Sequence, residues 1–175
     1  MSTAFTFTDK DILKSALVSP DGAEHYTTST TSGFRGRKVT TISAASGLVG
    51  SIDWRGKLFS INGVQRKWDE LKSRPGGILS TEREWNWGNR PYRLKFNFSE
   101  KELLATPTVG SDLDTVRFTP RHPHLVHDNE RAAIYFPHQL QDETERMFLL
   151  LAVLQTEMHR QDMNEASVAA ATSVG

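Results

Sequence analysis

Three histidines lie close together in the stretch from Arg121 to Asp128. In an extended segment His122 and His124 point to the same side, because side chains alternate along such a backbone. His127 or Asp128 could then fold back and complete a set of three ligands for zinc, copper or nickel. The spacing matches no established metal motif, and loop histidines beside a proline are commonly just solvated. The sequence therefore predicts His122, His124 and His127 as candidate metal ligands, with a solvated loop as the alternative.

A second group of side chains is basic. Phe34-Arg35-Gly36-Arg37-Lys38 forms a compact loop between two predicted strands, and Arg55-Gly56-Lys57 and Arg66-Lys67 lie at other joints. If these joints meet on one rim they would bind phosphate head groups, because arginine offers paired hydrogen bonds and lysine a point charge. Cations at strand ends also serve simply for solubility and to deter edge pairing. The candidate head-group ligands are Arg35, Arg37, Lys38, Arg55 and Lys57.

Two tryptophans indicate another kind of site. Trp85 and Trp87 share one face of a predicted strand, with Arg83 and Asn86 beside them. Such rings could line a pocket for a lipid tail, a sugar or a flat small molecule, as in a carrier or an enzyme. The alternative is that the rings pack around a buried helix. No histidine has a serine or carboxylate partner at a catalytic spacing, so no catalytic residue is assigned, enzymatic activity stays open and no cofactor is expected.

The composition limits the class of partner. The chain has 175 residues, with 21 Lys and Arg against 21 Asp and Glu, so its formal net charge is zero. A neutral chain has no strong overall attraction to nucleic acid, which we do not expect as a partner, whereas a local basic patch can still attract acidic lipid. The absence of cysteine excludes disulfides and thiolate metal sites. The first residues lack a secretory pattern, and no apolar run approaches the roughly 20 residues of a membrane span, so we expect a soluble, cytoplasmic protein.

Short β-strands must position most of these side chains. Apolar and polar residues alternate through much of the region from residue 4 to residue 136, most clearly from Tyr92 to Phe98, where the even positions are apolar. Turn signals such as Asn62-Gly63 and Gly88-Asn89 separate the strands. Strands of this length at such regular intervals predict a barrel or a sandwich.

One helix is predicted after the strands, from about residue 142 to about residue 162. Asp142 and Glu145 resemble a capping pair at its start. The eight residues from Met147 to Leu154 are all apolar and cover about two turns, so no side of the helix there can face water. We expect the strands to enclose this run; packing between subunits is the alternative, and the oligomeric state stays open. Residues 164–175 are small and polar, and we expect them to form a disordered tail.

This order of elements resembles the tubby C-terminal-like superfamily, with its LURP-one and scramblase-like members, in which a β-barrel encloses a C-terminal helix. More specifically, the chain is similar to a family of small fungal proteins of that superfamily, best known from mushroom-forming fungi. The resemblance implies association with lipid or a membrane surface, although no binding motif can be carried over residue by residue. The residues that carry it are Ile52-Asp53-Trp54, Leu58 to Gly63, Trp85-Asn86-Trp87, Pro91 to Lys95, Val116-Arg117-Phe118 and the helix from Asp142 to Arg160.

These observations combine into one expectation. The fold is an antiparallel β-barrel, tubby-like, that encloses one C-terminal hydrophobic helix in a single domain covering residues 4–163. The expected function is a non-enzymatic binding module for acidic phospholipid head groups or for a protein partner. The alternatives are a small-molecule-binding protein or enzyme with an aromatic-lined pocket, and a metal-binding protein that uses the histidines between residues 122 and 128.

Overall fold

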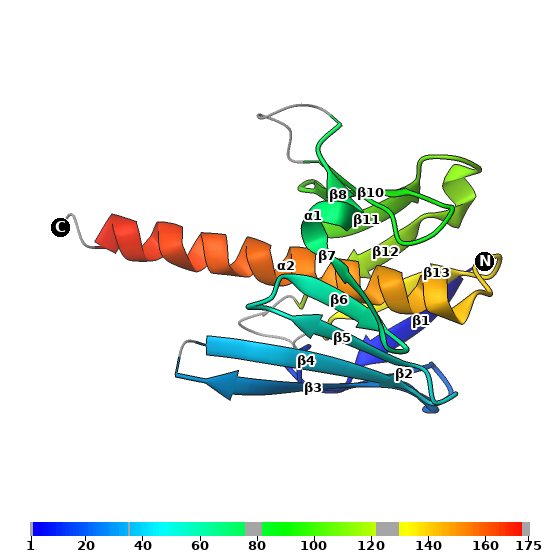
Figure 1. Ribbon diagram of the computed structural model, residues 1–175, viewed down its shortest axis with the longest axis horizontal. Coiled ribbons are helices and arrows are strands. Elements are labelled where there is room, and N and C mark those ends of the chain that lie inside the picture. The colour runs from blue at the N-terminus through cyan, green and yellow to red at the C-terminus, as the bar shows by residue number, and fades with distance from the viewer. Residues whose placement is uncertain (1, 35, 76–81, 122–129, 173–175) are drawn as a thin grey trace.

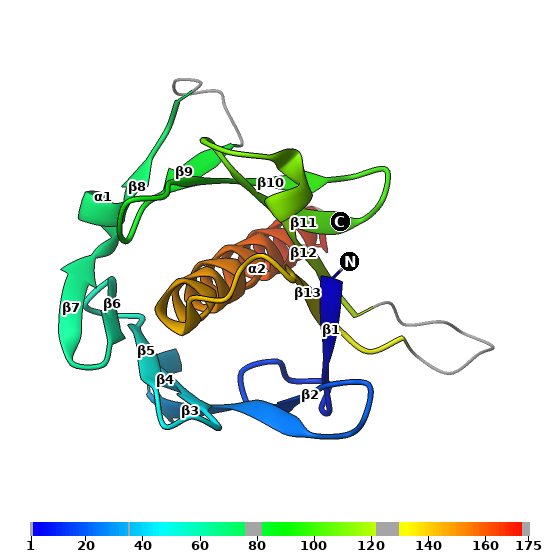
Figure 2. The same ribbon diagram turned by 90° about the vertical axis from the view of Figure 1, so that its right-hand side faces the viewer.

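The computed structural model describes residues 2–34, 36–75, 82–121 and 130–172. These residues form one antiparallel sheet of thirteen strands and one long C-terminal helix, so the predicted mainly β class is confirmed (Figure 1). Neighbouring strands in the sheet are also neighbours in the sequence, except that the first strand pairs with the last. The strands surround the helix when the molecule is viewed along it (Figure 2).

The elements are short apart from the helix and one hairpin. The first half of the chain contains β1 (Ser2–Phe7), β2 (Ala16–Val18), β3 (Glu24–Gly33), β4 (Gly36–Ala44), β5 (Val49–Asp53), β6 (Leu58–Ile61) and β7 (Val64–Lys67). The second half contains α1 (Trp68–Leu71), β8 (Lys72–Ser73), β9 (Arg83–Trp85), β10 (Tyr92–Asn97), β11 (Glu102–Pro107), a 3-10 turn (Asp112–Asp114), β12 (Val116–Thr119), β13 (Ala133–Pro137) and α2 (Glu143–Thr172).

The sheet is not closed into the barrel that we expected, because β7 and β8 are the two edges of the described sheet. The single turn α1 connects them. The Trp68 N–H donates to the carbonyl oxygen of Lys57 before β6, and the Leu71 carbonyl oxygen accepts from the N–H of Asn86 after β9, but β7 and β8 are not paired with each other in the described sheet. A side chain crosses the gap instead. Arg66 of β7 donates a hydrogen bond to the carbonyl oxygen of Trp87, and its guanidinium lies 5.0 Å from the centre of that indole ring.

Strand β10 shows how the alternating sequence pattern works and where it stops. Tyr92 and Leu94 are buried, while Arg93 and Lys95 between them are exposed. Phe98 was predicted on the same packed face but is 77% exposed. The reason is that β10 ends at Asn97, whose side-chain oxygen accepts hydrogen bonds from the backbone N–H and the hydroxyl of Ser99 and so begins a turn.

Helix α2 is buried over its first half. Its start is capped as predicted, since an oxygen of Asp142 accepts a hydrogen bond of 2.9 Å from the backbone N–H of Glu145. Every residue from Met147 to Leu154 is at most 1% exposed, so this chain alone covers the apolar run on all sides. At about 1.5–3 kcal/mol for each large apolar side chain, this burial is a dominant contribution to stability.

The second half of α2 corrects our expectation of a disordered tail. The helix ends at Thr172 and not near residue 162, and residues 164–172 are helical. Neither glycine nor proline interrupts the chain between Glu143 and Thr172, and alanines at 166, 169 and 170 favour helix even without packing. These last turns project from the sheet into solvent (Figure 1). Within the described ranges, neither α1 nor α2 has the length and apolar character that crossing a bilayer requires.

Candidate functional site

The candidate site is the end of the molecule where α2 leaves the sheet, which we call the exit end. It consists of α2 residues 155–162 and the strands and turns around them. Three hollows lie beside the helix here. One faces β3 and the segment before β2. The other two face β4 with the turn after β5, and β8, β9, β10 and β11. Gln155 and His159 line both of these last two hollows and separate them.

The hollow toward β4 contains tryptophan and arginine side chains. The guanidinium of Arg37 lies 5.1 Å from the centre of the Trp54 ring and also pairs with Asp162 of α2. The Trp54 indole N–H donates to the hydroxyl of Thr40 at 2.8 Å. Arg37 therefore already has partners in the protein and connects β4 to the helix. Trp68 and Arg55 complete the wall of this hollow.

The tip of the β3–β4 hairpin lies next to this hollow and extends beyond the sheet on the same side as the end of α2 (Figure 1). Phe34 at the tip is fully exposed. A Cβ atom built on Gly33 would lie 3.3 Å from an Nη atom of Arg55, so the hairpin and the β5–β6 turn are neighbours. Lys38, Arg55 and Lys57 are exposed, and their charged groups have no ion-pair partner among the described residues. The hairpin and the β5–β6 turn are thus side by side, while Arg35 lies outside the described residues, and a head-group site formed by these side chains stays a prediction.

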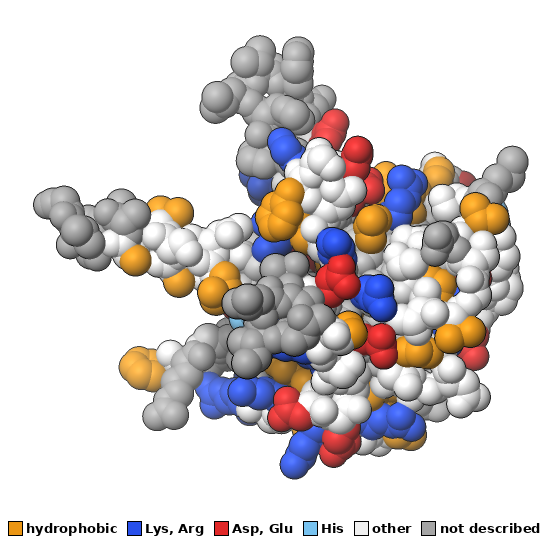
Figure 3. Space-filling model, turned by 90° about the horizontal axis from the view of Figure 1, so that it is seen from above, with side chains coloured by type: hydrophobic (Ala, Val, Ile, Leu, Met, Phe, Trp, Pro, Cys, Tyr) orange, Lys and Arg blue, Asp and Glu red, His pale blue; other side chains and the backbone are white. Residues whose placement is uncertain are grey.

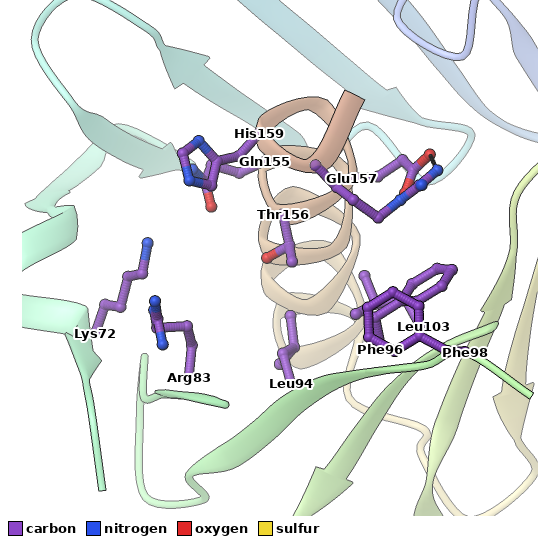
Figure 4. Close-up of a pocket in the computed structure, with 11 residues that line it drawn as sticks. Lys72, Arg83, Leu94, Phe96, Phe98, Leu103, Gln155, Thr156, Glu157 and His159 are labelled. Carbon is purple, nitrogen blue, oxygen red and sulfur yellow. Dashed lines mark hydrogen bonds and ion pairs between the residues drawn. The ribbon is translucent and has the colours of Figure 1, made fainter. Parts of the chain in front are cut away.

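The hollow toward β8 to β11, which we call the α2 hollow, has a volume of about 240 Å³ and two walls of different character (Figure 4). Lys72 of β8 and Arg83 of β9 form one side, and their charged ends lie near each other on one side of α2. Arg83 donates a hydrogen bond of 2.8 Å to the carbonyl oxygen of Glu82. The opposite wall is apolar and consists of Leu94, Phe96, Phe98 and Leu103.

The Lys72 ammonium is partly removed from water. Its Nζ lies 5.0 Å from the centre of the buried Trp85 ring, and among the described residues it has no ion-pair partner. Burial lowers the pKa of Lys72, and the like charges of Arg83 and Arg74 lower it further, while Asp69 opposes them. Burial, followed by the charge of Arg74, likewise lowers the pKa of Arg83. This side of the hollow is therefore electropositive, and a bound anion would reduce the repulsion between its cations.

The helix side of the α2 hollow carries a carboxylate that is already fully engaged. Glu157 is 1% exposed, and it accepts hydrogen bonds of 2.8 and 2.7 Å from Arg160 and of 2.8 Å from Gln161. The hydrogen bond to Glu157 is the main cause that raises the pKa of Arg160. Arg160 also covers the Phe96 ring at 4.8 Å. The charge of Glu157 is therefore balanced by Arg160 of the same helix, and Glu157 forms no ion pair with Lys72.

The two tryptophans that we considered for an aromatic opening pack around the helix. Trp85 is fully buried and stacks on Phe59, with ring centres 5.3 Å apart. Trp87 is partly buried, and its ring centre lies 5.9 Å from that of Phe148 in α2. Both rings therefore lie where the alternative interpretation put them, packed around the buried helix. Trp85 offers no ring face to solvent.

The histidine hypothesis falls outside the described part of the chain. His122, His124 and His127 all lie within residues 122–129, which are not described. Over the described ranges, no cluster of three or more histidine, aspartate or glutamate side chains is arranged to hold a metal ion. The metal hypothesis thus stays a prediction from the sequence.

Sequence reasoning did not find the α2 hollow. Lys72 lies in a segment that has no clear period, and the residues that line the hollow come from β8, β9, β10, β11 and α2, which are far apart in the sequence. A signal did exist: Gln155-Thr156-Glu157 are the first polar residues after the apolar run, so they mark where the helix reaches an opening. Comparison with protein-family models, curated proteins and solved structures finds no match to this chain.

Proposed function

We propose that this protein attaches reversibly to membrane surfaces that contain acidic phospholipids, and that it does so without catalysing a reaction. The observation that carries the proposal is Phe34, a fully exposed aromatic side chain at the tip of a projecting hairpin, beside three cations that have no ion-pair partner among the described residues. Lys and Arg side chains gather beside the projecting helix in Figure 3. An apolar tip with a basic surround matches the bilayer interface, where phosphate groups lie above acyl chains.

The expected strength is modest. A lysine or arginine near an acidic membrane surface contributes about 1 kcal/mol, so Lys38, Arg55 and Lys57 together supply attraction that salt weakens. Burying the Phe34 ring adds about 1.5–3 kcal/mol. Such a sum supports reversible binding, and neither contribution alone would hold the protein on a membrane.

The proposal also includes a relation to a known fold and a location in the cell. We propose that the chain is a distant member of the tubby C-terminal-like superfamily, with the sheet as a barrel opened between β7 and β8. The strand meander followed by a helix with an enclosed apolar run supports this relation. A cytoplasmic location would place the basic tip opposite the leaflet that carries the acidic lipids.

Co-sedimentation with vesicles tests the proposal. We expect binding to vesicles that contain phosphatidylserine or a phosphoinositide, weak binding to pure phosphatidylcholine, and loss of binding as salt rises. Phe34→Ala should lower the partition constant about tenfold, since it removes most of the inserted apolar surface. The double charge reversal of Lys38→Glu and Arg55→Glu should abolish the preference for acidic lipid.

Leu113→Ala is the matched control, because this residue is also an exposed apolar side chain but belongs to the 3-10 turn, which lies at the other end of the molecule (Figure 1). It should bind vesicles like the unmodified protein. Absence of lipid-dependent sedimentation at low salt would reject the membrane proposal and leave a protein partner as the ligand of this face. Equal losses for Phe34→Ala and Leu113→Ala would show that the hairpin tip is not the contact.

A further inference from the structure

The α2 hollow is a site distinct from the hairpin tip, and its two walls differ in a way that selects a ligand. We propose that the α2 hollow binds a single-chain anionic amphiphile, with its anionic head between Lys72 and Arg83 and its alkyl chain along Leu94, Phe96 and Leu103. The proposal does not depend on membrane attachment, because none of these residues belongs to the hairpin tip or to the β5–β6 turn.

The sign of the head group follows from the charges around Lys72. Arg83 and Arg74 repel its ammonium, Asp69 attracts it weakly, and the carboxylate of Glu157 is held by Arg160 and Gln161. The ammonium lies 5.0 Å from the centre of the Trp85 ring. A bound anion would supply the counter-charge that the described residues do not, and in a partly dry hollow such a pair is stronger than at an exposed surface.

The apolar wall indicates that the ligand has an alkyl chain, and the volume of the hollow indicates a single chain. Leu94 and Leu103 are buried at the inner end, and Phe98 is exposed at the outer end with its ring centre 5.1 Å from that of Phe96. This gives a continuous apolar strip from the interior to the surface, and it gives the exposed Phe98 ring a role. The volume of about 240 Å³ is below the roughly 300–1,000 Å³ of pockets for drug-sized ligands, so it suits one chain of medium length.

A buried polar side chain adds independent support. Gln155 is only 5% exposed, lines the hollow and makes no hydrogen bond to any described residue. Its amide is not among the buried side-chain groups that lack a partner, so it is accessible from the hollow, and a polar ligand group there could accept or donate a hydrogen bond in place of water. The side chain of Thr156 faces the same space in Figure 4. Both residues lie on the helix, across the hollow from Lys72 and Arg83.

Isothermal titration calorimetry with decanoate, decanol and decyltrimethylammonium tests the proposal below the concentrations at which these compounds aggregate. The three probes share one chain and differ in head-group charge. We expect decanoate to bind most tightly, decanol more weakly and the cation weakest. Lys72→Met keeps the length of the side chain but removes its charge, so it should weaken decanoate about tenfold and leave decanol unchanged.

Two further variants separate pocket binding from other causes. Thr156→Phe should fill the hollow and abolish binding of decanoate and decanol, with a circular dichroism melt to show that the protein remains folded. Lys38→Met, in the hairpin, should leave decanoate affinity unchanged while it weakens sedimentation with acidic vesicles. Equal affinity for decanoate and the cation, or a Lys72→Met variant that binds decanoate normally, would overturn the amphiphile site without affecting the membrane proposal.

Discussion

Tyr92 shows how the fold accommodates a polar atom in its interior. The residue is fully buried, and its hydroxyl donates a hydrogen bond of 2.6 Å to an oxygen of Glu145, near the start of α2. Burial is the main cause that raises the pKa of the Tyr92 hydroxyl, and the hydrogen bond to Glu145 raises it further. The guanidinium of Arg90 lies over the ring at 5.6 Å and also pairs with Asp114. The neutral hydroxyl is thus part of the link between β10 and the helix.

Tyr92→Phe should lower the free energy of unfolding by about 1.5 kcal/mol at neutral pH, because Glu145 loses its donor. The pKa of Tyr92 is raised in the folded protein, so the contribution of its hydroxyl is complete below the ordinary tyrosine pKa of 10.0 and is lost as pH rises through the raised value. Urea unfolding from about pH 8 to about pH 11 should therefore show the difference between the two proteins shrinking above pH 10.

Tyr135→Phe is the control for that measurement. The Tyr135 side chain packs against Arg117, and its hydroxyl makes no hydrogen bond to a described residue. The substitution should change stability little at any pH. A Tyr92→Phe difference that stays constant from neutral to alkaline pH would contradict the assigned role of the hydroxyl.

At the scale of elements, the parts that could be predicted are those that local chemistry decides. The start of α2 at Asp142 and the burial of the run from Met147 to Leu154 could both be predicted, because each follows from residue types alone. The end of α2 and the gap between β7 and β8 could not be predicted. The helix end depends on the helix propensity of the last residues, which include several alanines, and this effect is weak. The gap depends on whether the four residues from Trp68 to Leu71 form a helical turn or continue a strand. The α2 hollow could not be predicted for another reason. Its walls come from strands and a helix that are distant in the sequence, and no local pattern shows how far apart they lie.

The packing of β5 on α2 depends on a glycine. A Cβ atom built on Gly50 would lie 2.6 Å from the sulfur of Met147 and 2.8 Å from its Cγ, closer than real contacts allow. Met147 is fully buried, so its side chain has little room to move away. Gly50→Ala should therefore destabilise the protein by about 1–3 kcal/mol in urea unfolding.

Gly88→Ala is the matched control for Gly50, because a Cβ atom there meets nothing within 4 Å. Its effect should be within about 0.5 kcal/mol of zero. Met147→Ala should also remove most of the cost of Gly50→Ala, since the clash is with that side chain. If Gly50→Ala costs as much in the Met147→Ala background as alone, the close approach of β5 to α2 is not what limits this position.

At the scale of the whole molecule, the hairpin β3–β4 and the last turns of α2 project from the same end, and the 3-10 turn lies at the other (Figure 1). This polarity gives the membrane proposal a geometric consequence. A bilayer pressed against the exit end would contact the hairpin tip and the helix end together and would leave the 3-10 turn in water.

Three single cysteines can read this orientation, because the chain has no cysteine of its own. Ser32 lies near the hairpin tip, Ser167 in the projecting part of α2 and Ser111 beside the 3-10 turn, and all three are exposed. Each Ser→Cys variant would carry one environment-sensitive fluorophore. With acidic vesicles we expect a blue shift at positions 32 and 167 and none at position 111, since only the first two would enter the less polar interface. A shift at position 111 with none at position 32 would mean that the opposite end meets the membrane, and the arrangement of Phe34 and its neighbouring cations would then need a different explanation.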